Sequence, residues 1–173
     1  MNLFHVAFLP LMPGAVIEPG NFGRCIQLHQ ACSFMAHREA IYELIRAKEF
    51  PEKPSRLESI FLLPTAEEAY QYKAEFASLN IVYEVEVLNP YEKQHTTFID
   101  LVCVPKNPAE PVHALCAHAR NYWQSSLEPF RIESTHPLAV TESTVASMGT
   151  GQPTRSRELV IESPIRIVRR LDA

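Results

Sequence analysis

Fourteen prolines, against only five glycines, are distributed along the 173 residues of this chain. Proline fixes the backbone angle φ and lacks an amide hydrogen, so it ends most helices and is confined to the edges of sheets. The prolines therefore divide the chain into short elements. Because 46% of the residues are hydrophobic and 21% are charged, we expect these elements to pack around one core, as a single domain over residues 1–173.

Hydrophobic periodicity indicates where these elements lie. We predict strands at 3–9, 59–63, 81–88, 97–104, 158–161 and 165–170, and helices at 27–48, 66–77 and 110–124. Thr65 and Glu68 have the pattern of a capping box at the start of the second helix. Strands and helices do not alternate regularly, which argues against a doubly wound sheet. The predicted fold class is α+β, with helices flanking a mixed, mainly antiparallel and possibly split β-sheet.

The overall charge and the cysteines exclude several classes of partner. A net charge of −4 gives no general attraction for nucleic acid or for an anionic membrane. Basic residues do cluster locally, at Arg155, Arg157, Arg166, Arg169 and Arg170. No two cysteines form a C-x-x-C pair, so we expect buried free thiols in a reducing compartment and no metal site. The four cysteines are Cys25, Cys32, Cys103 and Cys116.

The N-terminal residues give an expectation about location. They lack the basic region and the long apolar core of a secretion signal. No apolar run in the chain approaches the ~20 residues that a membrane helix needs. We therefore expect a cytoplasmic protein, or one delivered into a host or target cell without a cleaved signal, and no membrane partner.

The N-terminal part of the chain has two candidate binding segments. His5 lies inside an apolar strand, where an imidazole is either a hydrogen-bonded core residue or a fixed donor to a ligand hydroxyl. The loop that follows contains Gly20 and Arg24. Glycine lets the backbone approach a ligand closely, and successive amides can bind a phosphate that an arginine also contacts. The alternatives are an ordinary turn and a solvated arginine.

Two further candidates lie near predicted strands. In "PSRLESIFL", Ser59 and the preceding arginine can hold a ligand, and Phe61 can stack on a flat ring or belong to the core. Glu158 opens a late strand, directly after a stretch rich in Ser, Thr, Gly and Pro over residues 134–156. It is either a catalytic acid at the rim of a cleft or a surface acid paired with Arg155 or Arg157.

The order of these segments resembles the ADP-ribosyltransferase superfamily, and most closely the rifampin ADP-ribosyltransferase type. The resemblance is carried by "FHVAFLPLMPGAVIEPGNFG", "SIFLLPTAEEAYQY", "VYEVEV" and "SRELVIESPIRI". The chain is also similar to an uncharacterised bacterial family, often placed in this superfamily, that shares "PSRL-x-S-(I/L)-F", "YW" and "E-L-(L/V)" elements. The resemblance covers most of the chain and is weakest between Pro90 and Thr154.

The resemblance implies a split β-sheet with a cleft for NAD. His5 would bond the ribose of the adenosine half, and Phe61 would stack near the nicotinamide. Glu158 would bond the 2′-hydroxyl of the nicotinamide ribose and stabilise an oxocarbenium-like transition state, since a fixed carboxylate favours developing positive charge. Gly20, Arg24 and Ser59 complete the expected contacts with NAD.

The function implied is mono-ADP-ribosyl transfer from NAD to a protein or small-molecule acceptor, with release of nicotinamide. A catalytically inactive module that binds NAD or another nucleotide is the alternative. It is suggested by Phe61, where relatives often have tyrosine, and by Ser156, where many protein-modifying relatives have Gln or Glu. RNA 2′-phosphotransfer would need a strongly basic cleft, which the net charge argues against. A plain interaction protein would require every resemblance to be accidental.

Overall fold

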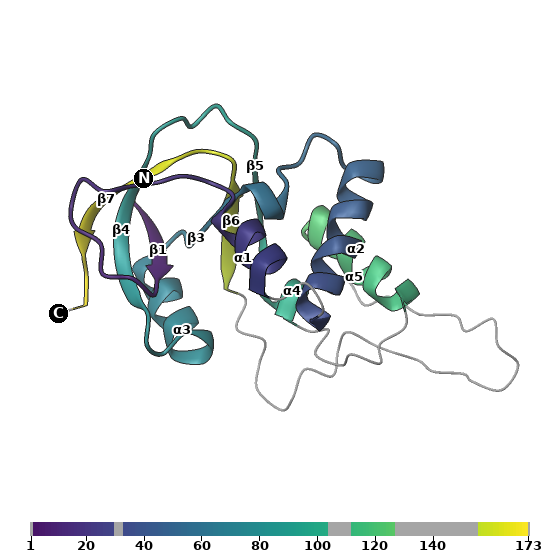
Figure 1. Ribbon diagram of the computed structural model, residues 1–173, viewed down its shortest axis with the longest axis horizontal. Coiled ribbons are helices and arrows are strands. Elements are labelled where there is room, and N and C mark those ends of the chain that lie inside the picture. Colours follow the sequence, from purple (N-terminus) through teal and green to yellow (C-terminus); the bar gives the residue numbers. More distant parts are fainter. Residues whose placement is uncertain (1, 30–32, 104–111, 127–155, 173) are drawn as a thin grey trace, which may run out of the picture.

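The protein, described here from a computed structural model, contains two antiparallel β-sheets with helices packed against them (Figure 1). The structure describes residues 2–29, 33–103, 112–126 and 156–172. The first sheet has the strand order β1 (Leu3–Ala7), β4 (Ile81–Val87), β7 (Ile165–Arg170) and β2 (Val16–Ile17). The second has the order β3 (Ile60–Leu62), β6 (Arg157–Ile161) and β5 (Gln94–Phe98). Every strand pair is antiparallel, so the predicted α+β class with antiparallel sheets is confirmed.

The helices cover the two sheets unevenly. They are α1 (Asn21–His29), α2 (Phe34–Glu49), the 3₁₀-helix η1 (Arg56–Glu58), α3 (Ala66–Phe76), α4 (Asp100–Cys103) and α5 (Val112–Gln124). Helix α3 lies against β1 and β4, whereas α2 and α5 pack together on the far side of the second sheet (Figure 1). None of the described helices is long and apolar enough to cross a lipid bilayer.

Within the described ranges, one isolated backbone bridge joins the two sheets, between β1 and the residue that follows β3. The amide of Phe4 donates to the carbonyl of Leu63 at 3.0 Å, and the amide of Leu63 donates back at 2.8 Å. One residue further along β1, the His5 side chain reaches across, with Nδ1 3.0 Å from the carbonyl oxygen of Phe61. His5 therefore provides a second link between the two sheets beside the backbone bridge.

Most predicted elements are confirmed with ends that shift by a few residues. The predicted strand at 97–104 is wrong beyond Phe98, because the following residues form the short helix α4. This segment is a run of apolar residues in which Ile99, Leu101 and Val102 are all buried, and such a run does not distinguish a buried strand from a buried helix. Residue 104, the last of the predicted strand, lies outside the described residues.

The predicted helix at 27–48 is instead two helices. Ser33 caps α2, since its hydroxyl oxygen accepts a hydrogen bond from the Ala36 amide at 3.2 Å. Helix α1 starts directly after Gly20, whose φ of +89° is readily adopted only by glycine. The predicted cap at Thr65 is confirmed, because its side chain accepts from the Glu68 amide at 3.1 Å. The Glu68 carboxylate bonds to the Thr65 hydroxyl instead of completing the box through the Thr65 amide.

Most of the described basic residues near the C-terminus are paired with acids. Arg166 bonds Glu86 at 3.1 Å, and Arg169 bonds Glu84 at 2.6 Å, both across the β4–β7 pair. Arg157 bonds Glu68 at 3.0 Å. Arg155 lies outside the described residues. Arg170 Nε donates instead to the backbone carbonyl of Asp172. Three of the four described residues of the basic cluster are therefore in ion pairs.

Gly23 is the point at which α1 packs against η1. A Cβ atom at position 23 would lie 2.3 Å from the carbonyl oxygen of Leu57. We expect Gly23→Ala to lower the free energy of unfolding by about 1–3 kcal/mol, because the backbone of η1 would have to move. Arg24→Ala, at the next and exposed position, should change it by less than ~0.5 kcal/mol. Equal urea midpoints for the two variants would contradict the close packing of α1 on η1.

Candidate functional site

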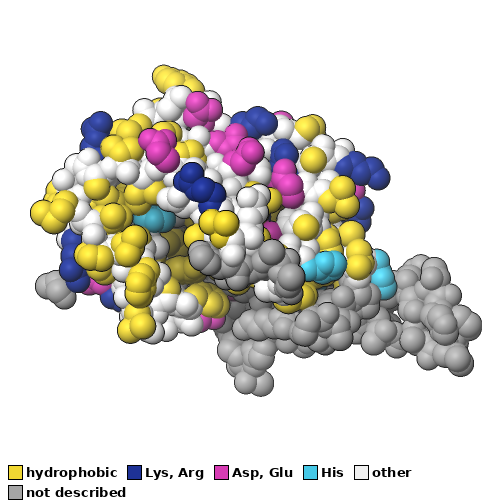
Figure 2. Space-filling model, in the orientation of Figure 1, with side chains coloured by type: hydrophobic (Ala, Val, Ile, Leu, Met, Phe, Trp, Pro, Cys, Tyr) yellow, Lys and Arg dark blue, Asp and Glu magenta, His cyan; other side chains and the backbone are white. Residues whose placement is uncertain are grey.

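A cavity of about 420 Å³ lies beside the bridge between the two sheets, within the size range of small-molecule sites. Its polar lining consists of His5, Arg38, Arg56 and Glu158. Its apolar lining consists of Val6, Phe22, Met35, Phe61, Leu62, Leu63, Tyr72, Phe76, Ile99 and Val102. Figure 2 shows hydrophobic side chains gathered around a hollow in one face, whereas acidic and basic side chains gather mainly on the surface above it.

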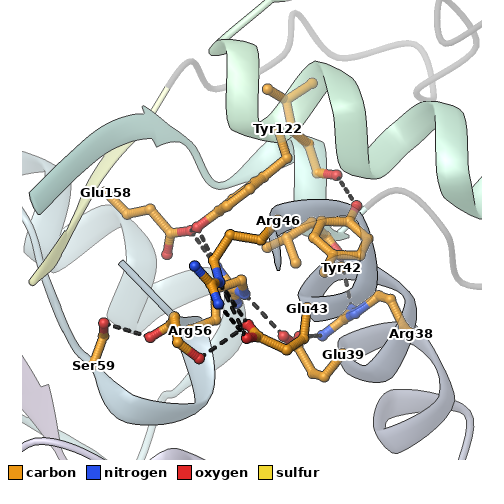
Figure 3. A network of polar contacts seen from close by, with 12 residues as sticks. Arg38, Glu39, Tyr42, Glu43, Arg46, Arg56, Ser59, Tyr122 and Glu158 are labelled. Atoms are coloured by element: carbon orange, nitrogen blue, oxygen red, sulfur yellow. Dashed lines mark hydrogen bonds and ion pairs between the residues drawn. The ribbon is translucent and has the colours of Figure 1, made fainter. Parts of the chain in front are cut away.

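Glu158 enters this cavity from strand β6. Side chains alternate along the strand, so Glu158 and Val160 face the helices while Leu159 and Ile161 pack between the sheets. Only 7% of Glu158 is exposed. Its Oε1 accepts hydrogen bonds from Arg56 Nη1 at 2.8 Å and from the Tyr122 hydroxyl at 2.6 Å (Figure 3). Among the described residues, no donor bonds to Oε2.

Arg56 is the buried cation that makes this arrangement possible. Its Nε donates to Glu39 Oε2 at 2.9 Å, while Nη1 donates to Glu158 (Figure 3). Its guanidinium carbon lies 4.6 Å from the ring centroid of Phe61 and 4.8 Å from that of Tyr122. Burial opposes the charged form, but the carboxylates of Glu39 and Glu158 hold the pKa of Arg56 well above its ordinary value. The guanidinium therefore stays charged and compensates both buried acids.

A second arginine, Arg38, extends this series of ion pairs. Arg38 Nη2 donates to Glu39 Oε1 at 2.9 Å, and Nη1 donates to the Val102 carbonyl at 2.7 Å. The order Arg38, Glu39, Arg56, Glu158 thus runs from α2 through η1 to β6 as two cations and two anions. Each charge has a partner of opposite sign within hydrogen-bond distance, which is the condition for burying Glu39, Arg56 and Glu158.

Tyr122 completes the cluster from helix α5. Its hydroxyl lies between Arg56 and Glu158 and bonds to both. Burial, together with the nearby Glu158 carboxylate, raises the pKa of Tyr122 well above its ordinary value, against the opposing charge of Arg56. The hydroxyl therefore keeps its proton and acts as a donor to Glu158. We refer to Glu39, Arg56, Tyr122 and Glu158 as the Arg56 cluster.

His5 presents an acceptor to a ligand, and not the donor that was one of the two alternatives left open by the sequence. Burial lowers the pKa of His5, although the hydrogen bond with the Phe61 carbonyl acts in the opposite direction. The ring is therefore neutral near pH 7. A carbonyl oxygen can only accept, so Nδ1 carries the ring proton and Nε2 has a free lone pair. A ligand hydroxyl at Nε2 would donate to His5.

The structure brings three of the six predicted site residues into the cavity lining: His5, Phe61 and Glu158. Phe61 is half-buried, and its ring meets Phe22 edge-on at 5.1 Å. Glu158 is not a surface acid paired with Arg157, because Arg157 bonds Glu68 instead.

The other three predicted residues, Gly20, Arg24 and Ser59, do not line the cavity. The Gly20 amide faces the carbonyl oxygen of Ser59 at 3.5 Å. The Ser59 hydroxyl donates to the carbonyl of Ser55 at 2.6 Å. Arg24 is exposed and bonds to the side chain of Asn21. All three therefore stabilise the local structure around α1 and η1.

Sequence reasoning missed Tyr122 and Arg38 and left the role of Arg56 open. The available indication was physical: a carboxylate buried in a strand needs a cation nearby. The sequence did not indicate which arginine supplies it, because Arg56 precedes Glu158 by 102 positions. Tyr122 was recognised only as part of a helix and of the "YW" element.

Asp100, at the start of α4, is buried in addition to Glu39 and Glu158, and burial together with the charge of Glu75 raises its pKa from 3.8 to about 6. Its Oδ2 has no hydrogen-bond partner among the described residues. A raised pKa means that the folded state holds the proton more tightly than the unfolded state, so this contribution to stability is lost as pH rises from about 4 to about 6.

We therefore expect the stability of Asp100→Asn relative to wild type to increase with pH. Between pH 4 and pH 8 the difference in free energy of unfolding should change by roughly 1–3 kcal/mol in favour of the variant. Urea unfolding of both proteins at several pH values measures it. A difference that does not vary with pH would contradict the raised pKa.

The described cysteines and acids form no metal site. No group of three or more His, Cys, Asp or Glu side chains in the described ranges is arranged to hold an ion. Cys25 is exposed and Cys116 is half-buried, and both are free thiols. The expectation of buried thiols is therefore wrong for Cys25, which lies on the outer face of α1. Cys32 and the side chain of Cys103 lie outside what the structure describes.

The chain belongs to a family described as "Protein of unknown function (DUF2441)", whose model matches residues 15–135. No curated protein matches the sequence. The matched range contains Arg56, Phe61 and Tyr122, whereas His5 and Glu158 lie on either side of it. The family match therefore covers the helical wall of the cavity and β3 but excludes the strands that carry the histidine and the acid.

Proposed function

We propose that the protein is an NAD-dependent mono-ADP-ribosyltransferase that modifies a protein or small-molecule acceptor and releases nicotinamide. One observation carries the proposal. The residues to which the ADP-ribosyltransferase resemblance gives roles in ribose binding, nicotinamide stacking and catalysis are His5, Phe61 and Glu158. They come from β1, β3 and β6 and line the same cavity. The two antiparallel sheets, joined at one bridge beside this cavity, are compatible with the split sheet of that superfamily.

In the proposed reaction, the bond between ribose C1′ and the nicotinamide nitrogen breaks, and nicotinamide leaves as a neutral molecule. A nucleophile of the acceptor then bonds to C1′ and loses a proton. Positive charge develops on the ribose as the first bond breaks, and a fixed carboxylate favours that charge. Glu158 Oε2 is the oxygen suited to this role, since Oε1 already accepts two hydrogen bonds.

The remaining cavity residues would orient NAD and exclude water. His5 Nε2 would accept a hydrogen bond from a ribose hydroxyl, because Nδ1 is directed at the Phe61 carbonyl. Phe61 would provide an aromatic surface next to the leaving group. The apolar side chains on α3, including Tyr72 and Phe76, would limit access of water to the ribose, which favours transfer to the acceptor over hydrolysis.

A non-catalytic module that binds NAD or a related nucleotide is the second candidate, and the Arg56 cluster favours it. The ion pair of Arg56 with Glu158 reduces the negative charge available to an oxocarbenium-like ribose. The same guanidinium lies over the Phe61 ring, so a cationic nicotinamide would have to use the rest of that aromatic surface. Both features weaken catalysis more than they weaken binding.

Nicotinamide release by the purified protein separates the two candidates. The protein is incubated with NAD, nicotinamide is quantified, and the shift in melting temperature with NAD is read in the same samples. Release above a heat-inactivated control supports the transferase. A thermal shift without release, repeated with a mixture of protein and small-molecule acceptors, supports the binding module. If the protein shows no nicotinamide release and no thermal shift at millimolar NAD, both candidates are rejected.

A further inference from the structure

Three short sequence elements that the proposed reaction does not fully use meet at one point in the structure. "PSRL" contains Arg56, "YW" contains Tyr122, and "ELV" contains Glu158. These residues come from η1, α5 and β6. Arg56 and Glu158 lie 66 and 36 positions away from Tyr122 in the sequence, yet the Tyr122 hydroxyl bonds to both. A hydroxyl shared between a cation and an anion has a defined direction: its oxygen accepts from Arg56, and its proton is donated to Glu158.

The Tyr122 side chain is held from several directions. Its ring packs edge-on against Trp123 at 4.8 Å and against Tyr42 at 5.4 Å. Its backbone carbonyl accepts from His95 Nε2 at 3.1 Å and from the Thr97 hydroxyl at 2.9 Å. The position of the hydroxyl is therefore set by the core between α5 and β5, and thermal rotation of the ring is restricted.

The fixed hydroxyl determines how the Glu158 carboxylate is oriented. Two donors, one from Tyr122 and one from Arg56, bond to the same oxygen, Oε1. With Oε1 held at two points, rotation of the carboxylate about its last bond would break both hydrogen bonds. Oε2 is thereby kept available toward the cavity that Glu158 lines.

We propose that Tyr122 is a positioning residue, which fixes the Glu158 carboxylate so that Oε2 is the oxygen presented to a bound ligand. The catalytic part of this inference rests on the proposed transferase function. The positioning itself does not, because it is a property of the side chains alone. Tyr122 does not line the cavity, so its effect on a ligand passes through Glu158.

Tyr122→Phe tests the inference, with Tyr42→Phe as the matched control. Both tyrosines are fully buried in the same core, and each substitution removes one hydroxyl and keeps the ring. The Tyr42 hydroxyl donates to the Leu101 carbonyl at 2.7 Å, whereas the hydrogen bonds of Glu158 come from Arg56 and Tyr122. If Tyr122 had a purely structural role, the two substitutions would affect the Glu158 carboxylate and the activity to a similar extent.

The first measurement is the orientation of Glu158 in high-resolution crystal structures of wild type and both variants. We expect one carboxylate rotamer in wild type and in Tyr42→Phe, and two or more rotamers in Tyr122→Phe. A single, unchanged rotamer in Tyr122→Phe would overturn the inference. This measurement needs no turnover, so it decides the inference even if wild type releases no nicotinamide and the proposed function fails.

The second measurement applies if wild type releases nicotinamide. We expect kcat of Tyr122→Phe to fall on the order of tenfold, with KM for NAD within about twofold of wild type, because the cavity wall is unchanged. Tyr42→Phe should keep both constants. An equal loss of kcat in both variants, or a change confined to KM in Tyr122→Phe, would assign Tyr122 a structural role only and leave the transferase function intact.

Discussion

Glu158→Gln is expected to reduce nicotinamide release from NAD by roughly two to three orders of magnitude. Glutamine keeps an oxygen that can accept from Arg56 and Tyr122 but has no negative charge to stabilise an oxocarbenium-like ribose. The loss should therefore fall mainly on kcat, measured by steady-state release of nicotinamide. Since the substitution also removes a buried ion pair, the fraction of folded protein is verified by near-UV circular dichroism at the assay temperature.

Glu162→Gln is the matched control for this variant. Glu162 lies just beyond the end of β6, and its Oε1 accepts from the Ser55 amide at 2.7 Å, a bond that glutamine can also accept. It does not line the cavity, so nicotinamide release should stay near the wild-type rate. A Glu158→Gln variant that retains most of the activity would show that Glu158 is a structural partner of Arg56 and that catalysis depends on other residues.

Arg56→Met should have the largest effect on stability, with a loss of about 3–5 kcal/mol in the free energy of unfolding. Methionine fills similar space but leaves Glu158, which is 7% exposed, without a cation among the described residues, whereas Glu39 keeps its ion pair with Arg38. An unpaired buried carboxylate must either stay charged at high cost or take up a proton. Urea unfolding followed by fluorescence of Trp123 measures the change.

Arg166→Met provides the comparison for Arg56→Met. Arg166 also bonds a glutamate, Glu86, but both side chains are about half exposed, and water replaces the lost partner. Its unfolding midpoint should stay close to that of wild type. If both arginine variants lose the same stability, the burial of the Arg56 cluster is not what makes its ion pairs important.

The elements that sequence alone predicted are those whose local pattern is unambiguous. The alternation in residues 81–88, the cap at Thr65 and the pair of strands around Pro164 all depend on neighbours within a few positions. Elements defined by distant packing were predicted less well. Helix α1 depends on the left-handed Gly20 and on the close approach of Gly23 to η1, neither of which hydrophobic periodicity reports.

The residues of the candidate site also divide into those that the sequence indicates and those that only the fold reveals. Glu158 and His5 stand out in sequence because a charged or imidazole side chain is unusual in an apolar strand. Their partners do not stand out, because an arginine in a polar stretch and a tyrosine in an amphipathic helix are ordinary. Only the fold shows that Arg56 and Tyr122 meet Glu158, since residues separated by tens of positions converge when the helices pack on the second sheet.

The alternation of Arg38, Glu39, Arg56 and Glu158 has a consequence for how the cavity selects a ligand. Four charges that sum to zero within a few ångströms produce a strong local field but little potential at a distance beyond a Debye length. Diffusional capture of an anion or a cation therefore gains little from this site, and its rate should depend only weakly on ionic strength. Discrimination takes place after entry, when individual oxygens and nitrogens meet the ligand at contact distance.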